Sequence, residues 1–166
     1  MATTRRFVLS TVGISTLLRA ADRELGGRLI DAANDTRLED PLKGEVDGLR
    51  DLVIAELVAG DLDRNRELSA ELKGIYALYE DQLARRSADM HVLVATDTAL
   101  GRLAAEIVQA CLRSQGVSTS IYAPPELSTA DSGAFSRGIK ELIEWCEYNA
   151  PASQMVSYEV VINLTG

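Results

Sequence analysis

Histidine, cysteine and aromatic residues are scarce in this sequence. Its 166 residues include one His, two Cys and only 5% aromatic residues. A single imidazole, His91, excludes His-rich zinc sites and most catalysis that uses histidine as a general base. Cys111 and Cys146 lie in apolar helical patterns without metal-ligand spacing, so we expect two buried thiols in a reducing compartment. We therefore expect no bound metal and no cofactor.

Basic residues are the minority among the charged residues. Lys and Arg number 17 against 25 Asp and Glu, which gives a formal net charge of -8. This charge opposes the binding of long nucleic acid, whereas a small anion can still be held by a few backbone N–H groups. The sequence also lacks an apolar stretch long enough for a signal peptide or a membrane span, so we expect a cytoplasmic protein without a membrane partner.

Short apolar runs alternate with longer helical patterns. The runs are almost continuously apolar, which is typical of strands buried on both faces of a sheet. This order predicts an α/β fold, a Rossmann-like and mostly parallel sheet with helices on both faces. The length suits a single domain over residues 1–166. The expected strands are residues 7–12, 90–95, 117–122 and 158–164.

Only helical patterns occupy about residues 16–88, which predicts a helical insertion between the first two strands. Two further helices should follow the second and third strands, ended by Gly116 and Pro151. The apolar positions that define the helices are Leu17, Leu18, Ala21 and Leu25; Val46, Leu49, Leu52, Val53 and Leu57; Leu68, Leu72, Ile75, Tyr76, Tyr79 and Leu83 on one longer helix; residues 100–112; and residues within 134–149.

Three of the expected strands end in small polar residues and glycine, at residues 10–16, 95–102 and 163–166. Ligands of open α/β sheets bind at the carboxyl ends of strands. Ser15 or Thr16 is placed to cap the first helix, and Asp97 or Thr98 the helix after the second strand. Each segment alone is also compatible with an ordinary cap or turn. Three at one sheet edge favour a shared ligand crevice.

Several enzyme signatures are missing. Neither Gly-x-Gly-x-x-Gly, Gly-x-x-x-x-Gly-Lys nor Gly-x-Ser-x-Gly occurs, which disfavours dinucleotide redox chemistry, ATP hydrolysis and a hydrolase with a nucleophile elbow. The carboxylates are scattered along helical faces, where we expect them to face solvent.

Four segments in order resemble the CARF domains, the CRISPR-associated Rossmann-fold sensors of type III systems. These segments are residues 8–18 (VLSTVGISTLL), 67–72 (ELSAEL), 94–106 (VATDTALGRLAAE) and 161–166 (VINLTG). The resemblance implies a homodimer that binds a cyclic oligoadenylate, most often cyclic tetra-adenylate, with cyclic hexa-adenylate as the alternative. The ligand-binding positions that it implies are Thr11, Gly13, Ile14, Ser15, Thr16, Thr96, Asp97, Thr98, Gly101, Arg102, Asn163, Leu164, Thr165 and Gly166.

Some CARF relatives are ring nucleases, which open the cyclic messenger without a metal. In that route a ribose 2′-hydroxyl attacks the adjacent phosphate, and the resemblance implies a catalytic role for Ser15. The family's last motif usually continues through Gly-Phe-Lys into an effector domain, whereas this sequence stops at Gly166. Either a partner supplies the effector domain, or the chain is part of a larger effector protein. The end of the sequence inside a motif favours the second explanation.

Three functions remain open at this point. The first is a sensor of cyclic oligoadenylate that acts on a downstream effector domain. The second is a ring nuclease that cleaves the same ligand. The third is a regulatory domain for another small ligand, unrelated to CRISPR.

Overall fold

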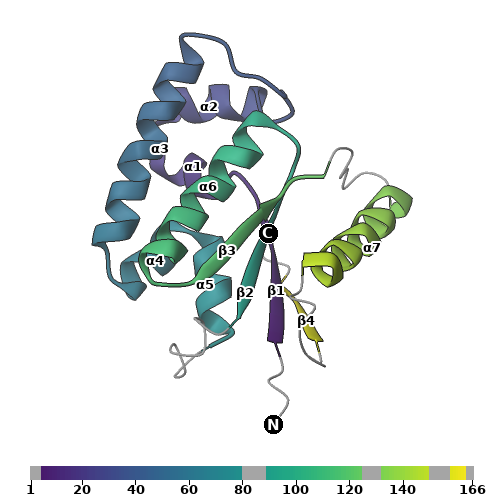
Figure 1. Ribbon diagram of the computed structural model, residues 1–166. Helices are drawn as coiled ribbons and strands as arrows, with labels where there is room; N and C mark the ends of the chain where they lie inside the picture. Colours follow the sequence, from purple (N-terminus) through teal and green to yellow (C-terminus); the bar gives the residue numbers. More distant parts are fainter. Residues whose placement is uncertain (1–4, 80–88, 125–131, 150–157, 164–166) are drawn as a thin grey trace.

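The computed structural model describes residues 5–79, 89–124, 132–149 and 158–163, and Figure 1 shows their arrangement. Strands and helices alternate as the sequence predicts. In chain order they are β1 (Arg5–Val12), α1 (Ser15–Ala20), α2 (Arg23–Asp31), α3 (Leu42–Ala59), α4 (Leu62–Leu68), α5 (Ala70–Ala77), β2 (Met90–Ala95), α6 (Ala99–Ser114), β3 (Ser118–Tyr122), α7 (Ser132–Asn149) and β4 (Tyr158–Asn163).

The described strands form one four-stranded sheet in the order β3-β2-β1-β4, and every neighbouring pair is parallel. The central strands are buried on both faces, since Val8 and Leu9 of β1 and Val92 and Leu93 of β2 all lie in the core. This explains their almost continuous apolar runs. The four strand predictions are confirmed within two residues at each described end.

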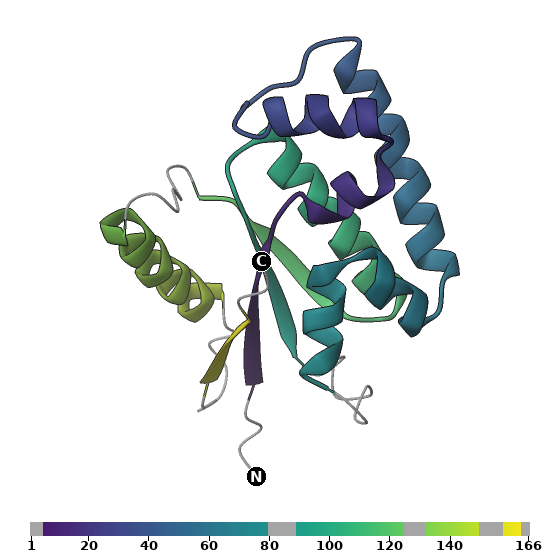
Figure 2. The ribbon, with the colours of Figure 1, turned by 180° about the vertical axis from the view of Figure 1, so that it is seen from behind.

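Helices cover both faces of the sheet, which confirms the predicted α/β class. Helices α1 to α6 lie on one face and α7 on the other, as Figures 1 and 2 show from opposite sides. This division follows from the strand order. The chain moves from β1 to β3 in one direction and then returns past β1 to β4, and crossovers between parallel strands are right-handed as a rule, so the reversal places α7 on the other face.

The hydrophobic core is correspondingly divided in two. One part lies between the sheet and helices α1 to α6 and includes Leu17, Leu57 and Ile107. The other is smaller and packs Leu142 and Cys146 of α7 against the opposite face of the sheet. Both cysteines are buried, as expected.

The predicted helical insertion is present, but one of its helices was predicted wrongly. The expected long helix through Leu68 and Tyr79 is two helices, α4 and α5, which meet at Ser69. Ser69 has extended backbone angles (φ -132°, ψ 122°), and its hydroxyl accepts a hydrogen bond of 3.2 Å from the Leu72 N–H. Ser69 therefore ends the helical path of α4 and caps α5. Leu83, expected on the same helix, lies outside the described residues.

The prediction for Leu52 was also wrong. Val46, Val53 and Leu57 of α3 are buried, whereas Leu52 is 70% exposed. The buried residues recur at spacings of seven and four, and Leu52 lies beside that stripe on the helix surface. It borders a surface groove between α2 and α3.

The helix ends agree with the sequence where they can be compared. Gly116 has a φ of +74° just after α6, the left-handed conformation that glycine adopts readily at a helix end. Pro151, expected to end α7, lies outside the described residues. Within the described ranges, no helix combines the length and hydrophobicity that crossing a membrane requires.

Candidate functional site

The carboxyl ends of β1, β2 and β4 lie at one edge of the sheet. Val12 of β1 is aligned with Ala95 of β2, and Ser10 of β1 with Asn163 of β4. β2 and β3 lie on one side of β1, and β4 lies on the other, so the order in which successive strands join the sheet reverses between β1 and β4. In open α/β sheets such a reversal point is the usual place for a ligand. The predicted site segments therefore converge there as far as they are described.

The turn between β1 and α1 differs from the expected helix cap. Ile14 occupies the cap position and makes no side-chain hydrogen bond to the helix. Ser15 and Thr16 are the first two residues of α1, and their hydroxyls donate to the side chain of Glu71 instead. The prediction that Ser15 or Thr16 caps this helix is therefore wrong, because a carboxylate from α5 lies within reach of both hydroxyls.

Glu71 is the centre of this arrangement and is only 2% exposed. Its Oε1 accepts hydrogen bonds from the Gly13 N–H at 3.2 Å and from the Ser15 hydroxyl at 3.1 Å. Its Oε2 accepts from the hydroxyls of Thr16 at 3.0 Å and Ser69 at 2.9 Å. Four donors offset the cost of removing this carboxylate from water. The side chain fastens the β1–α1 turn to the start of α5.

The expectation that the carboxylates face solvent is wrong for Glu71. The Ser69 cap places Glu71 in the first turn of α5, where the partial charge of the helix N-terminus favours an acidic side chain. One local signal of this burial is present in the sequence. Ser69 precedes Glu71 by two residues, and the apolar residues Leu68 and Leu72 flank the segment. Its partners in the β1–α1 turn are more than fifty residues away in sequence and leave no such signal.

The β2–α6 turn is an ordinary helix start with an unusually close glycine. Thr98 caps α6 by accepting a hydrogen bond of 3.0 Å from the Gly101 N–H, which confirms one of the two predicted caps. The hydroxyls of Thr96 and Thr98 are 3.1 Å apart. A Cβ on Gly101 would lie 2.2 Å from the Thr96 Oγ1 and 2.8 Å from the Thr96 carbonyl oxygen, so a side chain here would force the backbone of the turn to shift. The turn itself requires this glycine.

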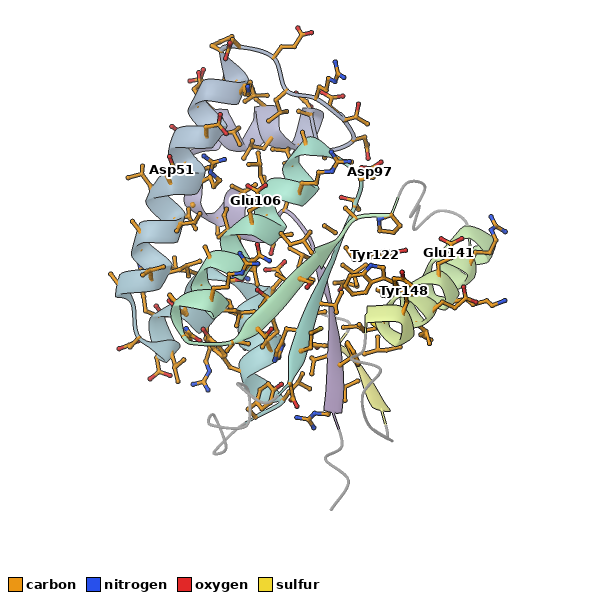
Figure 3. All side chains as sticks on the ribbon, in the orientation of Figure 1. Asp51, Asp97, Glu106, Tyr122, Glu141 and Tyr148 are labelled. Carbon is orange, nitrogen blue, oxygen red and sulfur yellow. The ribbon has the colours of Figure 1, made fainter. Side chains whose placement is uncertain are left out.

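Arg102 is paired with Asp97 by an ion pair at the exposed side of the same turn. Figure 3 shows Asp97 where β2 leads into α6. The insertion reaches this turn as well, because the Asp35 carbonyl accepts a hydrogen bond of 2.9 Å from the Ala99 N–H. Consequently Arg102 has a carboxylate partner, and the Ala99 N–H is already used within the protein.

The end of β4 contributes one described residue to this edge. The Asn163 amide nitrogen lies 3.5 Å from the hydroxyl oxygen of Ser10, to which it donates. Ser10 is fully buried, and Thr11 beside it on β1 is half-buried. The predicted positions Leu164, Thr165 and Gly166 lie outside the described residues.

A second polar network, largely buried, lies at the amino ends of the strands, opposite the candidate site. The sequence does not predict it. Arg6 donates to the Asp89 Oδ2 at 2.7 Å, and the Tyr79 hydroxyl donates to the same oxygen at 2.6 Å. The Tyr79 oxygen also lies 2.9 Å from the His91 Nε2. Burial, with the hydrogen bond to Asp89, raises the pKa of Tyr79 far above its ordinary value of 10. The hydrogen bond to Asp89 raises the pKa of Arg6. This network joins the turn after α5 to the amino ends of β1 and β2.

No group of three or more potential metal ligands occurs among the residues with described positions.

Aromatic contacts add little to the candidate edge. Tyr122 of β3 points toward α7 (Figure 3), where the centroid of its ring lies 5.8 Å from that of Trp145.

Comparison with protein families identifies a relationship for most of the chain. The model of a CRISPR-associated protein family, Cas_APE2256, matches residues 66–166. The chain belongs to this CRISPR-associated family. The matched region of this CRISPR-associated protein includes Glu71, the β2–α6 turn and β4, and it begins after the β1–α1 turn that contains Ser15. The curated proteins contain no match to the sequence.

Family membership decides one of the open alternatives. A regulatory domain unrelated to CRISPR is not supported, because the matched model describes a CRISPR-associated protein. The role of this chain is therefore sought within CRISPR defence.

Proposed function

We propose that this CRISPR-associated protein is a sensor of cyclic oligoadenylate, bound by a homodimer at the carboxyl ends of β1, β2 and β4. The observation that carries the proposal is the convergence of the CARF-like segments at this edge, in a chain of a CRISPR-associated family. A ring with two-fold symmetry suits a pocket made by two identical chains. In the intact system the sensor acts on an effector domain through a change in domain arrangement.

The exposure of the turns supports binding at this edge. Gly13 is exposed, and Ser15 and residues 96–98 are half-buried, whereas the strands directly beneath them are buried. A ligand at this edge therefore contacts polar turns that are held on a rigid sheet. Such support keeps the contacts in one geometry and reduces the entropy lost on binding.

Charge limits the kind of contact that the ligand makes. The chain has a net charge of -8, and the cation at this turn, Arg102, is shared with Asp97. Binding through many phosphate contacts is disfavoured by this distribution. Adenine and ribose, which offer uncharged hydrogen-bonding groups and ring faces, are the parts of the ligand that suit this edge best.

Calorimetric titration with cyclic tetra-adenylate and cyclic hexa-adenylate tests the proposal. We expect one ring to bind per two chains, with linear tetra-adenylate, the matched control of equal base content, binding more weakly. Sedimentation velocity should show a dimer in the presence of the ring. A folded protein that binds neither ring contradicts the proposal.

Ring cleavage is the second candidate, and the anchored hydroxyl of Ser15 favours it. This half-buried side chain has a fixed hydrogen-bond partner at the predicted ligand edge, which limits its motion beside a bound ribose 2′-hydroxyl, the attacking group of that route. Labelled cyclic tetra-adenylate should be incubated with the protein in chelator. Linear products that require Ser15 support a ring nuclease, and a ring that stays intact over many binding lifetimes supports a sensor alone.

A further inference from the structure

The hydroxyl hydrogen of Ser15 has a defined direction in this structure. Ser15 Oγ lies 3.1 Å from the Oε1 and 3.4 Å from the Oε2 of Glu71, and it donates to this carboxylate. A serine hydroxyl has one hydrogen and two acceptor lone pairs, whereas an ionised carboxylate only accepts. Because its hydrogen is used within the protein, Ser15 has only acceptor capacity left for a ligand.

We propose that Glu71 is a positioning residue that makes Ser15 a hydrogen-bond acceptor for a donor group of the bound nucleotide. This inference rests on the proposed function. The donor is the ribose 2′-hydroxyl or the adenine 6-amino group, since these are the donors of an adenylate ring. A phosphate oxygen, which only accepts, does not satisfy Ser15 in this state.

The other partners of Glu71 fill the rest of its capacity. Gly13 and Ser15 donate to one oxygen, and Thr16 and Ser69 to the other. A carboxylate offers about four acceptor positions, so none is left for a ligand. Glu71 is also buried, and it acts on the ligand only through Ser15 and the turn.

Ser15 is the member of this cluster that a ligand can reach. Thr16 and Ser69 are buried, whereas Ser15 is half-buried and stands beside the exposed Gly13. The three hydroxyls therefore divide into two that only stabilise the carboxylate and one that also faces the edge of the sheet. The buried negative charge of Glu71 beneath this turn acts in the same direction, because it disfavours a phosphate at Ser15.

The test compares the affinity of the protein for the unmodified ring with its affinity for analogue rings that lack one donor group. The ratio of the two affinities is the preference for that donor. One series replaces the 2′-hydroxyl with hydrogen or with fluorine, and the other replaces the 6-amino group with hydrogen. Loss of one hydrogen bond should weaken binding by about tenfold in the series that removes the contacted donor. The fluorine analogue tests whether Ser15 acts as the acceptor, since fluorine at the 2′ position cannot donate a hydrogen bond. Wild-type protein that is indifferent to both series overturns the inference without any variant.

Variants of Glu71 then separate positioning from simple support. Glu71→Met removes the acceptor and frees the Ser15 hydroxyl to donate as well as accept, so the tenfold preference should fall severalfold. Glu71→Gln retains an amide oxygen for Gly13 and Ser15 and should restore the preference. Thr16→Val is the matched control, because it removes another donor to Glu71 and leaves the Ser15 contact in place.

The outcomes distinguish this inference from the proposed function. If wild-type protein binds the unmodified ring and Glu71→Met keeps the full preference, Glu71 supports the fold only and the inference is wrong. If Glu71→Met does not fold, Ser15→Ala tests whether Ser15 is the acceptor: it must abolish the preference, and a Ser15→Ala variant that keeps the preference overturns the inference. If wild-type protein binds no ring at all, the proposed function fails, and the inference fails with it.

Discussion

Gly101 and Thr96 approach each other so closely that a Cβ added to Gly101 would lie 2.2 Å from the Thr96 Oγ1 and 2.8 Å from the Thr96 carbonyl oxygen. The backbone of α6 therefore starts directly against the end of β2. This contact fixes the β2–α6 turn at the edge where the other CARF-like segments converge. The glycine is required by the packing of the turn whether or not a ligand is bound.

Replacement of Gly101 should therefore destabilise the protein. We expect Gly101→Ala to lower the free energy of unfolding by about 1–3 kcal/mol, because the backbone of Thr96 must move to make room. Urea denaturation followed by circular dichroism measures the change. Gly48→Ala is the matched control, since nothing lies within 4 Å of its added Cβ in α3. It should stabilise the helix by about 0.5–1 kcal/mol. Equal effects of the two substitutions would contradict the close contact.

The Tyr79 network should make stability depend on alkaline pH. Because burial raises the pKa of Tyr79 in the folded protein, the unfolded chain loses this proton first, near pH 10. Above that pH the folded state binds more protons than the unfolded state, so stability falls as the pH rises. The slope approaches about 1.4 kcal/mol per pH unit for one group.

Tyr79→Phe is the variant that isolates this effect. It should be less stable than wild type near neutral pH, because it removes the hydrogen bond to Asp89. It should also show a shallower loss of stability between about pH 10 and pH 11, measured by urea titrations at each pH. Parallel curves for the two proteins across this range would show that Tyr79 is not the group responsible.

Asp97 should compete with the ligand for Arg102. The two side chains form an ion pair at the candidate edge, and both remain accessible to solvent. We expect Asp97→Asn to strengthen binding of cyclic tetra-adenylate severalfold and Arg102→Ala to weaken it, in calorimetric titrations at low salt. Stability should change by less than about 1 kcal/mol in either variant, because exposed ion pairs contribute little. Unchanged affinity in both would place the ligand away from this turn.

Two leucines of α3 should respond very differently to substitution. Leu57 is 1% exposed and Leu52 is 70% exposed, although both fit an apolar helical pattern in the sequence. Leu57→Ala should cost about 2–5 kcal/mol, and Leu52→Ala should stay within about 0.5 kcal/mol of wild type. Denaturation of both variants tests whether Leu57, and not Leu52, faces the core. Similar losses at the two positions would contradict this difference in burial.

Much of the secondary structure could be predicted because the relevant signals are local. Continuous apolar runs identified the four strands, and Gly116 marked the end of α6. Local signals failed where neighbouring elements decide the outcome. Ser69 interrupts a helical pattern because its cap and its bond to Glu71 favour extended backbone there, and nothing in the apolar spacing of α4 and α5 reveals it.

The candidate site shows the same division. Glycine and hydroxyl residues after β1 and β2 correctly marked the turns at the sheet edge, and Thr98 was correctly named as a possible cap. The partners of those residues were not predictable. Nothing local in the sequence indicates that Arg102 pairs with Asp97 or that the Ser15 hydroxyl bonds to Glu71.

The sequence by itself determined which segments are strands and helices, the α/β class and the polar character of the strand ends, since these depend on residues close together along the chain. The tertiary structure alone decided that β4 lies beside β1 and that Glu71 lies beneath the β1–α1 turn. Asn163 meets Ser10 across 153 positions, and Glu71 meets Ser15 across 56. Such pairs are chosen by the packing of the whole sheet and its helices, which brings distant donors and acceptors together only after the chain has folded.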